Sequence, residues 1–303
     1  MATQPSKSRM LLITAWAFLL LASGLPRIIL QEVFGYEVSF KVSSLFVAVV
    51  IIMGLMLTLI WSDVRGLRQF FILFLVLVVI EWIIFGVIAE LPVYKMWLSN
   101  PSFNINMLAN QSLRLMVTLA IIATLFVMKK QQDEFFLVKG NTNAEAEPVL
   151  WLGIKPGERW NPLGRNFAVI LSLGTLAFLV IAGRPPLNIA IRALPYLPFV
   201  LIAAVLNAFN EEMTYKASFL SVLENVVGKP QALVLMAAYF GIGHFYGIPY
   251  GVIGVLMPGF LGWFLGNAML ETRGLFWAWL IHFVQDVLIF AFLAIGSITP
   301  GGG

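Results

Sequence analysis

The stretch that decides the fold is PYLPFVLIAAVLNAFNEEMTYKASFLSVL, residues 195–223, which is apolar except near its middle, where Glu211 and Glu212 stand side by side. A helix needs about 20 apolar residues to cross the hydrocarbon core of a bilayer, and this stretch is long enough. An ionisable side chain at that depth costs a few kcal/mol or more, so it normally faces a protein interior and has a function. The stretch therefore predicts a membrane-spanning helix that carries part of a functional site.

The composition of the whole 303-residue chain also indicates a membrane protein. Hydrophobic residues make up 60% of it and charged residues 11%, whereas soluble domains contain roughly 25% charged residues. Apolar runs are continuous rather than alternating, as expected of helices. The net charge of +4 is explained by basic loop residues, and we find no nucleic-acid-binding motif. Without cysteine, the chain has no disulfide, thiolate metal site or cysteine nucleophile.

Nine apolar segments are candidates for membrane-spanning helices, and their lengths agree almost equally well with eight spans. The segments are residues 10–25, 43–61, 70–88, 113–128, 167–182, 195–223, 232–248, 252–270 and 275–295. We therefore predict an all-α, polytopic transmembrane bundle of eight to nine helices. The first segment follows basic residues, as in a signal peptide, but other apolar segments follow it directly, which favours a retained first helix.

One long polar stretch divides the predicted bundle. Residues 129–165 have mixed charge, turn-forming Gly-Asn and Pro-Gly pairs, and too few apolar residues for a separate core. We interpret residues 1–128 as an N-terminal membrane unit of four spans, residues 129–165 as a cytoplasmic linker, and residues 166–298 as a C-terminal catalytic membrane domain. Basic residues before the first span and after the second and fourth spans predict a cytoplasmic N-terminus.

Both histidines of the chain and three acidic residues lie in apolar segments of this C-terminal domain. The segments read FNEEMTYKASF (209–219), FGIGHFYGIPYG (240–251) and WLIHFVQDVLIF (279–290). Their candidate site residues are Glu211, Glu212, His244, His282 and Asp286. One such residue could be an accident, but five in three segments of one domain predict a common site.

The two glutamates cannot have the same role. Residues four apart share a helix face, so Glu212 and Lys216 are expected to form an ion pair. Glu211 lies about 100° away around the helix. We therefore expect Glu211 to face the site while Lys216 holds Glu212.

The same spacing relates two further pairs. It places the Phe240 ring beside the imidazole of His244, and it lets the Asp286 carboxylate hydrogen-bond to His282. Such a bond would fix the tautomer of His282 or keep its imidazole protonated.

These residues could catalyse hydrolysis without a covalent nucleophile. A carboxylate and an imidazole in a shielded cavity can take a proton from water, and a second imidazole can stabilise the oxyanion that forms on an amide. Two histidines and one glutamate could also bind zinc, although no His-Glu-x-x-His motif is present. We expect no metal and no other cofactor, and we keep a divalent metal such as zinc as the alternative.

Three ordered motifs resemble a known family. Glu-Glu-x-x-x-(Arg/Lys), Phe-x-x-x-His and His-x-x-x-(Asn/Asp) are similar to those of the CPBP intramembrane proteases, a group with the type II CAAX prenyl proteases, Abi-like proteins and lysostaphin-resistance-protein-A-like domains. The matching residues are Glu211, Glu212, Lys216, Phe240, His244, His282 and Asp286. The resemblance covers residues 195–292, about a third of the chain.

The resemblance implies a helical bundle around a cavity that opens toward the cytosol and the bilayer. It implies an intramembrane endopeptidase in which Glu211 and His244 activate water while His282 and Asp286 form the oxyanion site. The expected partners are membrane lipid and a peptide or lipidated protein substrate, with CAAX-type prenylated proteins among the candidates. The expected location is the plasma (inner) membrane of a bacterium.

The chain departs from the family pattern at two positions. Lys216 stands where the family usually has arginine, which keeps the charge but loses bidentate geometry. Asp286 stands where asparagine is common, and an ionised aspartate cannot donate to an oxyanion. We therefore hypothesise that Asp286 acts through His282 by keeping it cationic.

Simpler interpretations and two other function classes stay open. Each motif alone could be structural: a solvated face, a core histidine or an interhelical hydrogen bond. For Glu81, an intramembrane acid with no motif around it, we favour a structural contact. The alternative functions are a non-catalytic membrane immunity or regulatory protein with the protease fold, and a proton-coupled transporter, for which the sequence lacks inverted halves.

Overall fold

The computed structural model describes residues 5–298, and within them the chain is helical with no β-strand. Two isolated bridges, Glu145–Arg159 and Val149–Ile154, order the polar stretch before α7. The helices are α1 (Pro5–Leu21), α2 (Leu25–Ile28), α3 (Phe40–Ile60), α4 (Arg68–Ile83), α5 (Pro92–Leu98), α6 (Phe103–Val127), α7 (Trp160–Gly183), α8 (Leu187–Arg192), α9 (Leu197–Glu211), α10 (Ser218–Val227), α11 (Lys229–Ile242), α12 (Val252–Thr272) and α13 (Phe276–Ser297). Short π-helical segments follow α2 (Ile29–Val33), α4 (Ile84–Ile88) and α9 (Glu212–Ala217).

The protein is an integral membrane protein of the predicted all-α class. Within residues 5–298, seven helical segments are long and apolar enough to cross a membrane, and a pair bent by 48°, Arg9–Leu21 with Leu25–Val33, can make an eighth. Of the nine predicted spans, the one at residues 232–248 is wrong. Helix α11 has 14 residues, about 21 Å at 1.5 Å per residue, and the glycines and proline of residues 243–251 then turn the chain.

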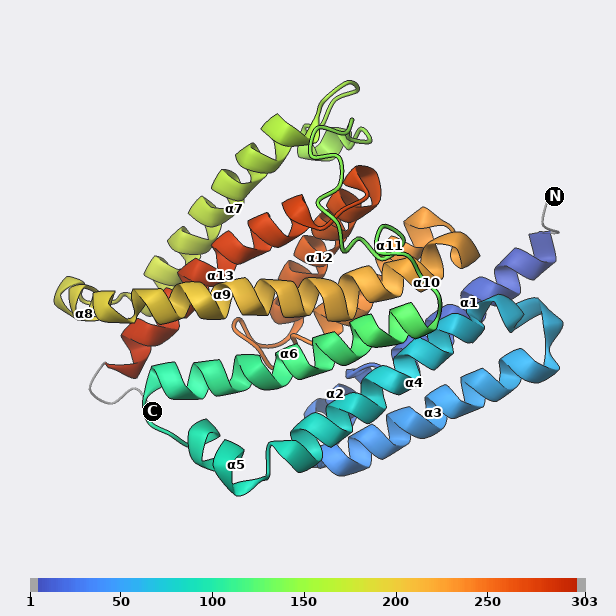
Figure 1. Cartoon of the computed structure of the whole chain (residues 1–303), viewed down its shortest axis with the longest axis horizontal. Coiled ribbons are helices and arrows are strands. Elements are labelled where there is room, and N and C mark those ends of the chain that lie inside the picture. The colour runs from blue at the N-terminus through green and yellow to red at the C-terminus, as the bar shows by residue number, and fades with distance from the viewer. Residues whose placement is uncertain (1–4, 299–303) are drawn as a thin grey trace.

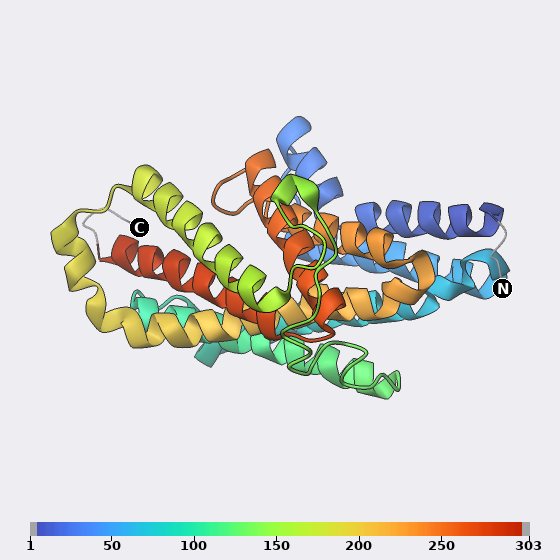
Figure 2. The same ribbon diagram turned by 90° about the horizontal axis from the view of Figure 1, so that it is seen from above.

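The arrangement of three helices positions the candidate site. Helix α9 lies between α13 and α6, as both Figure 1 and Figure 2 show, and it packs against each of them. Helices α11 and α12 are paired, and α4 packs against α3 and α6. Because α6 precedes the polar stretch and α9 and α13 follow it, the site can draw residues from both parts of the chain.

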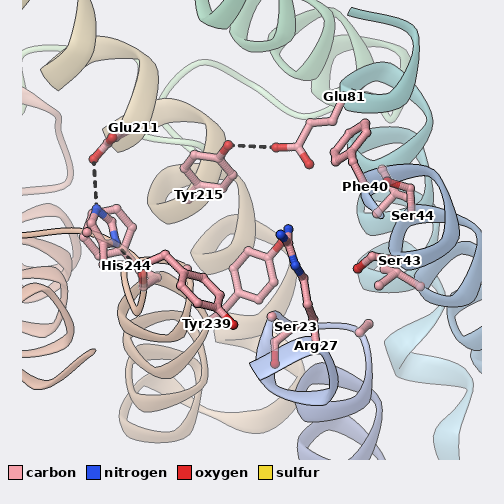
Figure 3. A pocket seen from close by; sticks show the side chains of 18 of the residues that line it. Ser23, Arg27, Phe40, Ser43, Ser44, Glu81, Glu211, Tyr215, Tyr239 and His244 are labelled. Atoms are coloured by element: carbon pink, nitrogen blue, oxygen red, sulfur yellow. Dashed lines mark hydrogen bonds and ion pairs between the residues drawn. The ribbon is translucent and has the colours of Figure 1, made fainter. Parts of the chain in front are cut away.

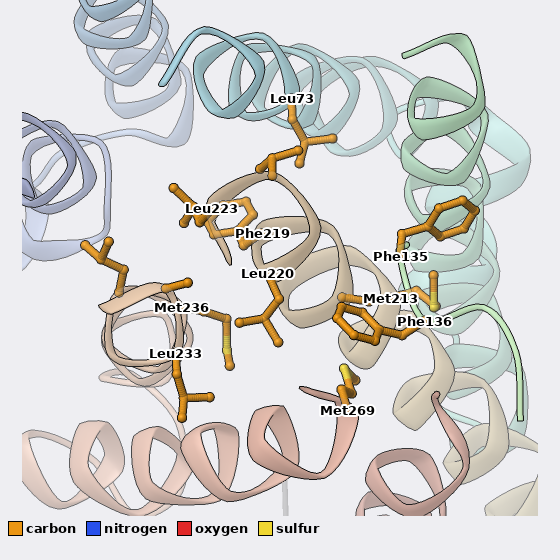
Figure 4. Close-up of a cluster of buried hydrophobic side chains, with 14 of the residues drawn as sticks. Leu73, Phe135, Phe136, Met213, Phe219, Leu220, Leu223, Leu233, Met236 and Met269 are labelled. Carbon is orange, nitrogen blue, oxygen red and sulfur yellow. The ribbon is translucent and has the colours of Figure 1, made fainter. Parts of the chain in front are cut away.

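One hydrophobic core joins these parts. Figure 4 shows Leu73 of α4, Phe219 and Leu220 of α10, and Met269 of α12 around a common centre. Phe135 and Phe136, from the predicted linker, are fully buried in the same cluster. Lipid is as apolar as these side chains, so close van der Waals packing rather than hydrophobic transfer holds such helices together. The linker is therefore anchored in the bundle.

Candidate active site

The break between α9 and α10 separates the two glutamates. Helix α9 ends at Glu211, and residues Glu212–Ala217 form a π-helical segment. A π-helical turn has i→i+5 hydrogen bonds, which changes the direction of successive side chains, and it is frequent at functional sites. Glu211 lines a cavity, whereas Glu212 is fully buried and contacts α13.

Glu212 holds a buried array of charged groups. Its Oε1 atom accepts hydrogen bonds from Lys216 Nζ and from His282 Nδ1, each at 2.6 Å. A carboxylate only accepts, so the Nδ1 atom of His282 carries the hydrogen. The ammonium of Lys216 also lies 3.6 Å from the centroid of the Phe240 ring. The ion pair expected between Glu212 and Lys216 is thus present.

We expected His282 to hydrogen-bond to Asp286, but the hydrogen bond of its imidazole is made to Glu212. Asp286 Oδ2 lies 3.6 Å from His282 Nε2, which is too long for a hydrogen bond. The same oxygen accepts from Asn207 Nδ2 at 3.0 Å, and Asn207 Oδ1 accepts from Gln111 Nε2 at 3.0 Å. Packing of α9 against α13 brings the amide of Asn207 to Asp286, a contact that spacing within one helix does not specify.

Glu211 stands among three basic groups. Its Oε2 atom lies 3.6 Å from His282 Nε2 and 3.9 Å from His244 Nε2. Its Oε1 atom lies 3.7 Å from Arg114 Nη1. These separations exceed direct hydrogen bonds and are of the kind that a water molecule can bridge.

The local contacts of His244 orient its reactive nitrogen. Its Nδ1 atom donates to the carbonyl oxygen of Phe240 at 2.7 Å, because a carbonyl only accepts. The Phe240 ring packs against the imidazole as expected, with centroids 4.5 Å apart. In the neutral ring the Nε2 atom, which faces Glu211, is then free to accept a proton.

A cavity of about 550 Å³ opens in front of Glu211 and His244 (Figure 3). Its size is typical of ligand-binding pockets. Its wall is formed by α2, α3, α4 and α6 as well as by the segment from α9 to the loop after α11. Among the described residues, Glu212, His282 and Asp286 are not part of this wall and lie behind Glu211.

Most residues of the cavity wall were outside the predicted site, and Glu81 and Arg114 are two charged examples. Glu81 accepts a hydrogen bond from the hydroxyl of Tyr215 at 2.7 Å, and both line the cavity. Arg114 lines it beside Glu211. The sequence placed Arg114 at the start of a span that begins at residue 113. In the structure α6 begins at Phe103, so Arg114 lies well within the length of the helix. An arginine followed directly by a long apolar run was the available signal.

Comparison with known proteins identifies part of the chain. Residues 193–288 match the family model described as type II CAAX prenyl endopeptidase Rce1-like. This region is an Rce1-like domain. It confirms the resemblance to the CPBP proteases and, at family level, supports a CAAX-type membrane protease. No curated protein and no solved structure matches the chain.

The Rce1-like domain contains all seven residues that the motifs singled out. Arg27, Glu81 and Arg114, which also line the cavity, lie outside the matched region. The cavity in front of the motif residues is therefore partly built by a region to which the family match does not extend.

The zinc alternative can be compared with the arrangement of the acidic and imidazole side chains. Within residues 5–298, no group of three or more His, Asp and Glu side chains is arranged to hold a metal ion. Glu212 is already paired with the Lys216 ammonium, and a cation in that position competes with a metal ion.

Proposed function

We propose that this protein is an intramembrane endopeptidase that hydrolyses a peptide bond in a membrane-associated substrate, with CAAX-type prenylated proteins as the leading class. The observation that carries the proposal is the meeting of Glu211 and His244 at the wall of a 550 Å³ cavity among membrane-spanning helices. The Rce1-like domain supports the same reaction.

In the proposed reaction, water is the nucleophile. Glu211 Oε2 and His244 Nε2 together act as the general base. They accept one proton from the water molecule while the water oxygen bonds to the carbonyl carbon of the substrate. The peptide C–N bond then breaks, and the proton passes to the leaving nitrogen. The products are a carboxylate and an amine, so no redox partner or cofactor is consumed.

The neighbouring groups prepare this step. His282, fixed by Glu212, presents Nε2 to Glu211 and so orients its carboxylate. Arg114 contacts the other oxygen of Glu211 and borders the cavity, so we assign to it the stabilisation of the oxyanion. We assign to Asp286 the role of keeping His282 cationic, because its Oδ2 atom lies 3.6 Å from His282 Nε2. This distribution replaces a direct oxyanion role for His282 and Asp286.

The test is cleavage of a fluorogenic, farnesylated CAAX-type peptide and of its non-prenylated form by detergent-purified protein. We expect Glu211→Gln and His244→Asn each to lower the rate by about 10²- to 10⁴-fold. Glu90→Gln is the control, since Glu90 is exposed and pairs with Lys95. Undiminished cleavage by both site variants would overturn the assignment, and binding without any cleavage would favour a non-catalytic regulatory protein.

We also propose that the N-terminus is cytoplasmic and that the protein resides in the bacterial plasma (inner) membrane. The distribution of basic residues near the ends of the spans supports this orientation. A cysteine introduced at the N-terminus should be protected from a membrane-impermeant maleimide in intact cells, and labelling there would reverse the topology.

A further inference from the structure

Arg27 lies in α2, just after the bend that follows α1, and its side chain is held in a fixed orientation. Its Nε atom donates to Gln31 Oε1 at 2.7 Å, and the hydroxyl of Tyr246 donates to the same oxygen at 3.1 Å. The guanidinium carbon lies 5.6 Å from the centroid of the Tyr246 ring. The hydrogen bond of Nε and the contact with the Tyr246 ring thus fix the orientation of the guanidinium.

In the part of the chain that the structure describes, the two terminal nitrogens of Arg27 have no partner. Among residues 5–298, no acidic side chain forms an ion pair with Arg27, and no hydrogen bond is formed by its Nη atoms. The other two cations of this region differ, because Arg114 contacts Glu211 and Lys216 is paired with Glu212. Arg27 is half-buried and lines the cavity, and Figure 3 shows its side chain extending into that space.

A guanidinium with this geometry is suited to a carboxylate. Its planar fork can donate two parallel hydrogen bonds to the two oxygens of one carboxylate, an arrangement that lysine cannot reproduce. Because Nε and the ring contact already orient the fork, little side-chain entropy is lost on binding.

We propose that Arg27 binds the C-terminal carboxylate of the substrate peptide and thereby determines which peptide bond reaches Glu211. This inference rests on the proposed peptidase function and names a specificity-determining residue outside the Rce1-like domain. Tyr246, which contacts Arg27, follows His244 by two residues in the same loop. The anion site is therefore linked directly to the imidazole that takes part in the reaction.

The link has a consequence for the cleavage position. An extended peptide advances by about 3.3 Å per residue, so a carboxylate held at Arg27 places one particular bond at Glu211 and His244. A peptide whose terminal carboxylate is replaced by an amide loses this anchor.

The experiment measures binding without turnover. Fluorescein-labelled, farnesylated CAAX-type peptides that differ only in a C-terminal acid or amide are titrated into Glu211→Gln protein in phosphatidylcholine nanodiscs. The same titration is made with Arg27→Gln, Arg27→Lys or Arg192→Gln added, the last being an exposed arginine of α8. We expect the acid to bind roughly 10- to 100-fold more tightly than the amide, as for charge-assisted bonds.

In Arg27→Gln, the affinities for the acid and the amide peptide should differ by no more than about twofold. Arg27→Lys should keep part of the preference for the acid, and Arg192→Gln should keep all of it. Three results would overturn the proposal: equal binding of acid and amide, a preference that survives Arg27→Gln, or no binding of the acid peptide. If the preference survives Arg27→Gln, the amount of phosphatidylglycerol that co-purifies with each variant is compared, and a loss of this lipid in Arg27→Gln alone would assign the residue to a lipid phosphate.

A separate cleavage assay with the unsubstituted Glu211 protein distinguishes the two proposals. Acid preference without cleavage of either peptide would leave the Arg27 site standing and remove the peptidase function. Cleavage without acid preference would do the reverse. Equal unfolding temperatures of the Arg27 variants and their parent would show that the bundle is intact.

Discussion

Replacement of Lys216 by methionine tests whether the buried array at Glu212 is held together by charge. Lys216 and Glu212 are both fully buried, with Nζ and Oε1 2.6 Å apart. Methionine retains much of the apolar stem but removes the cation. The Glu212 carboxylate would then keep one hydrogen bond, to His282, while its Oε2 atom already has no hydrogen-bond partner among the described residues.

The expected magnitude follows from the burial of the pair. Removing one partner of a buried ion pair costs about 3–5 kcal/mol, because an uncompensated charge remains in the interior. The contact of the ammonium with the Phe240 ring is lost as well, and such contacts contribute about 0.5–2 kcal/mol. The two losses add to about 3.5–7 kcal/mol, so at about 2–4 °C per kcal/mol for a large domain the unfolding temperature should fall by roughly 7–28 °C.

The assay is thermal unfolding in detergent followed by the fluorescence of the nine tryptophans. Lys229→Met is the matched control, since Lys229 Nζ lies 3.9 Å from Glu147 Oε1 and the two side chains are 43% and 71% exposed. Such a pair contributes about 0–1 kcal/mol.

The double variant Glu212→Gln/Lys216→Met completes a thermodynamic cycle. Because it removes both charges, it should lose less stability than the sum of the two single changes. Additive single effects, or a Lys216→Met protein as stable as the Lys229→Met control, would refute the view that a buried ion pair organises the site.

Three further predictions concern the reaction and the packing around it. Arg114→Gln should lower kcat/KM by about 10- to 100-fold and Arg114→Lys by less, and unchanged kinetics would remove Arg114 from the mechanism. Gly241→Val should destabilise the protein by about 1–3 kcal/mol, because a Cβ there would lie 2.5 Å from the carbonyl oxygen of Val255. Gly174→Val, where nothing lies within 4 Å, should leave the unfolding temperature nearly unchanged, and equal shifts would contradict the packing argument. Cleavage should be insensitive to a strong chelator, and a loss of activity that zinc restores would revive the metal alternative.

Local relationships within single helices could be read from the sequence. The pairs Glu212–Lys216 and Phe240–His244 were predicted from helical spacing, and both contacts are present in the structure. The spacing of His282 and Asp286 also made them neighbours, but neighbours on a helix need not bond to each other. Asp286 accepts a hydrogen bond from Asn207 because α9 packs against α13. The spacing of residues within one helix contains no information on that packing.

By itself, therefore, the sequence determined that the chain is a helical membrane protein, that Glu211 and both histidines belong to one region, and which residues share a helix face. These follow from hydrophobic length and from helical periodicity, which are local properties. Only the tertiary structure decided that Arg114 contacts Glu211, that Arg27 enters the same cavity, and that α11 is too short to span the membrane. Those features depend on how helices distant in sequence pack together, and the free energy of that packing is a property of the whole bundle.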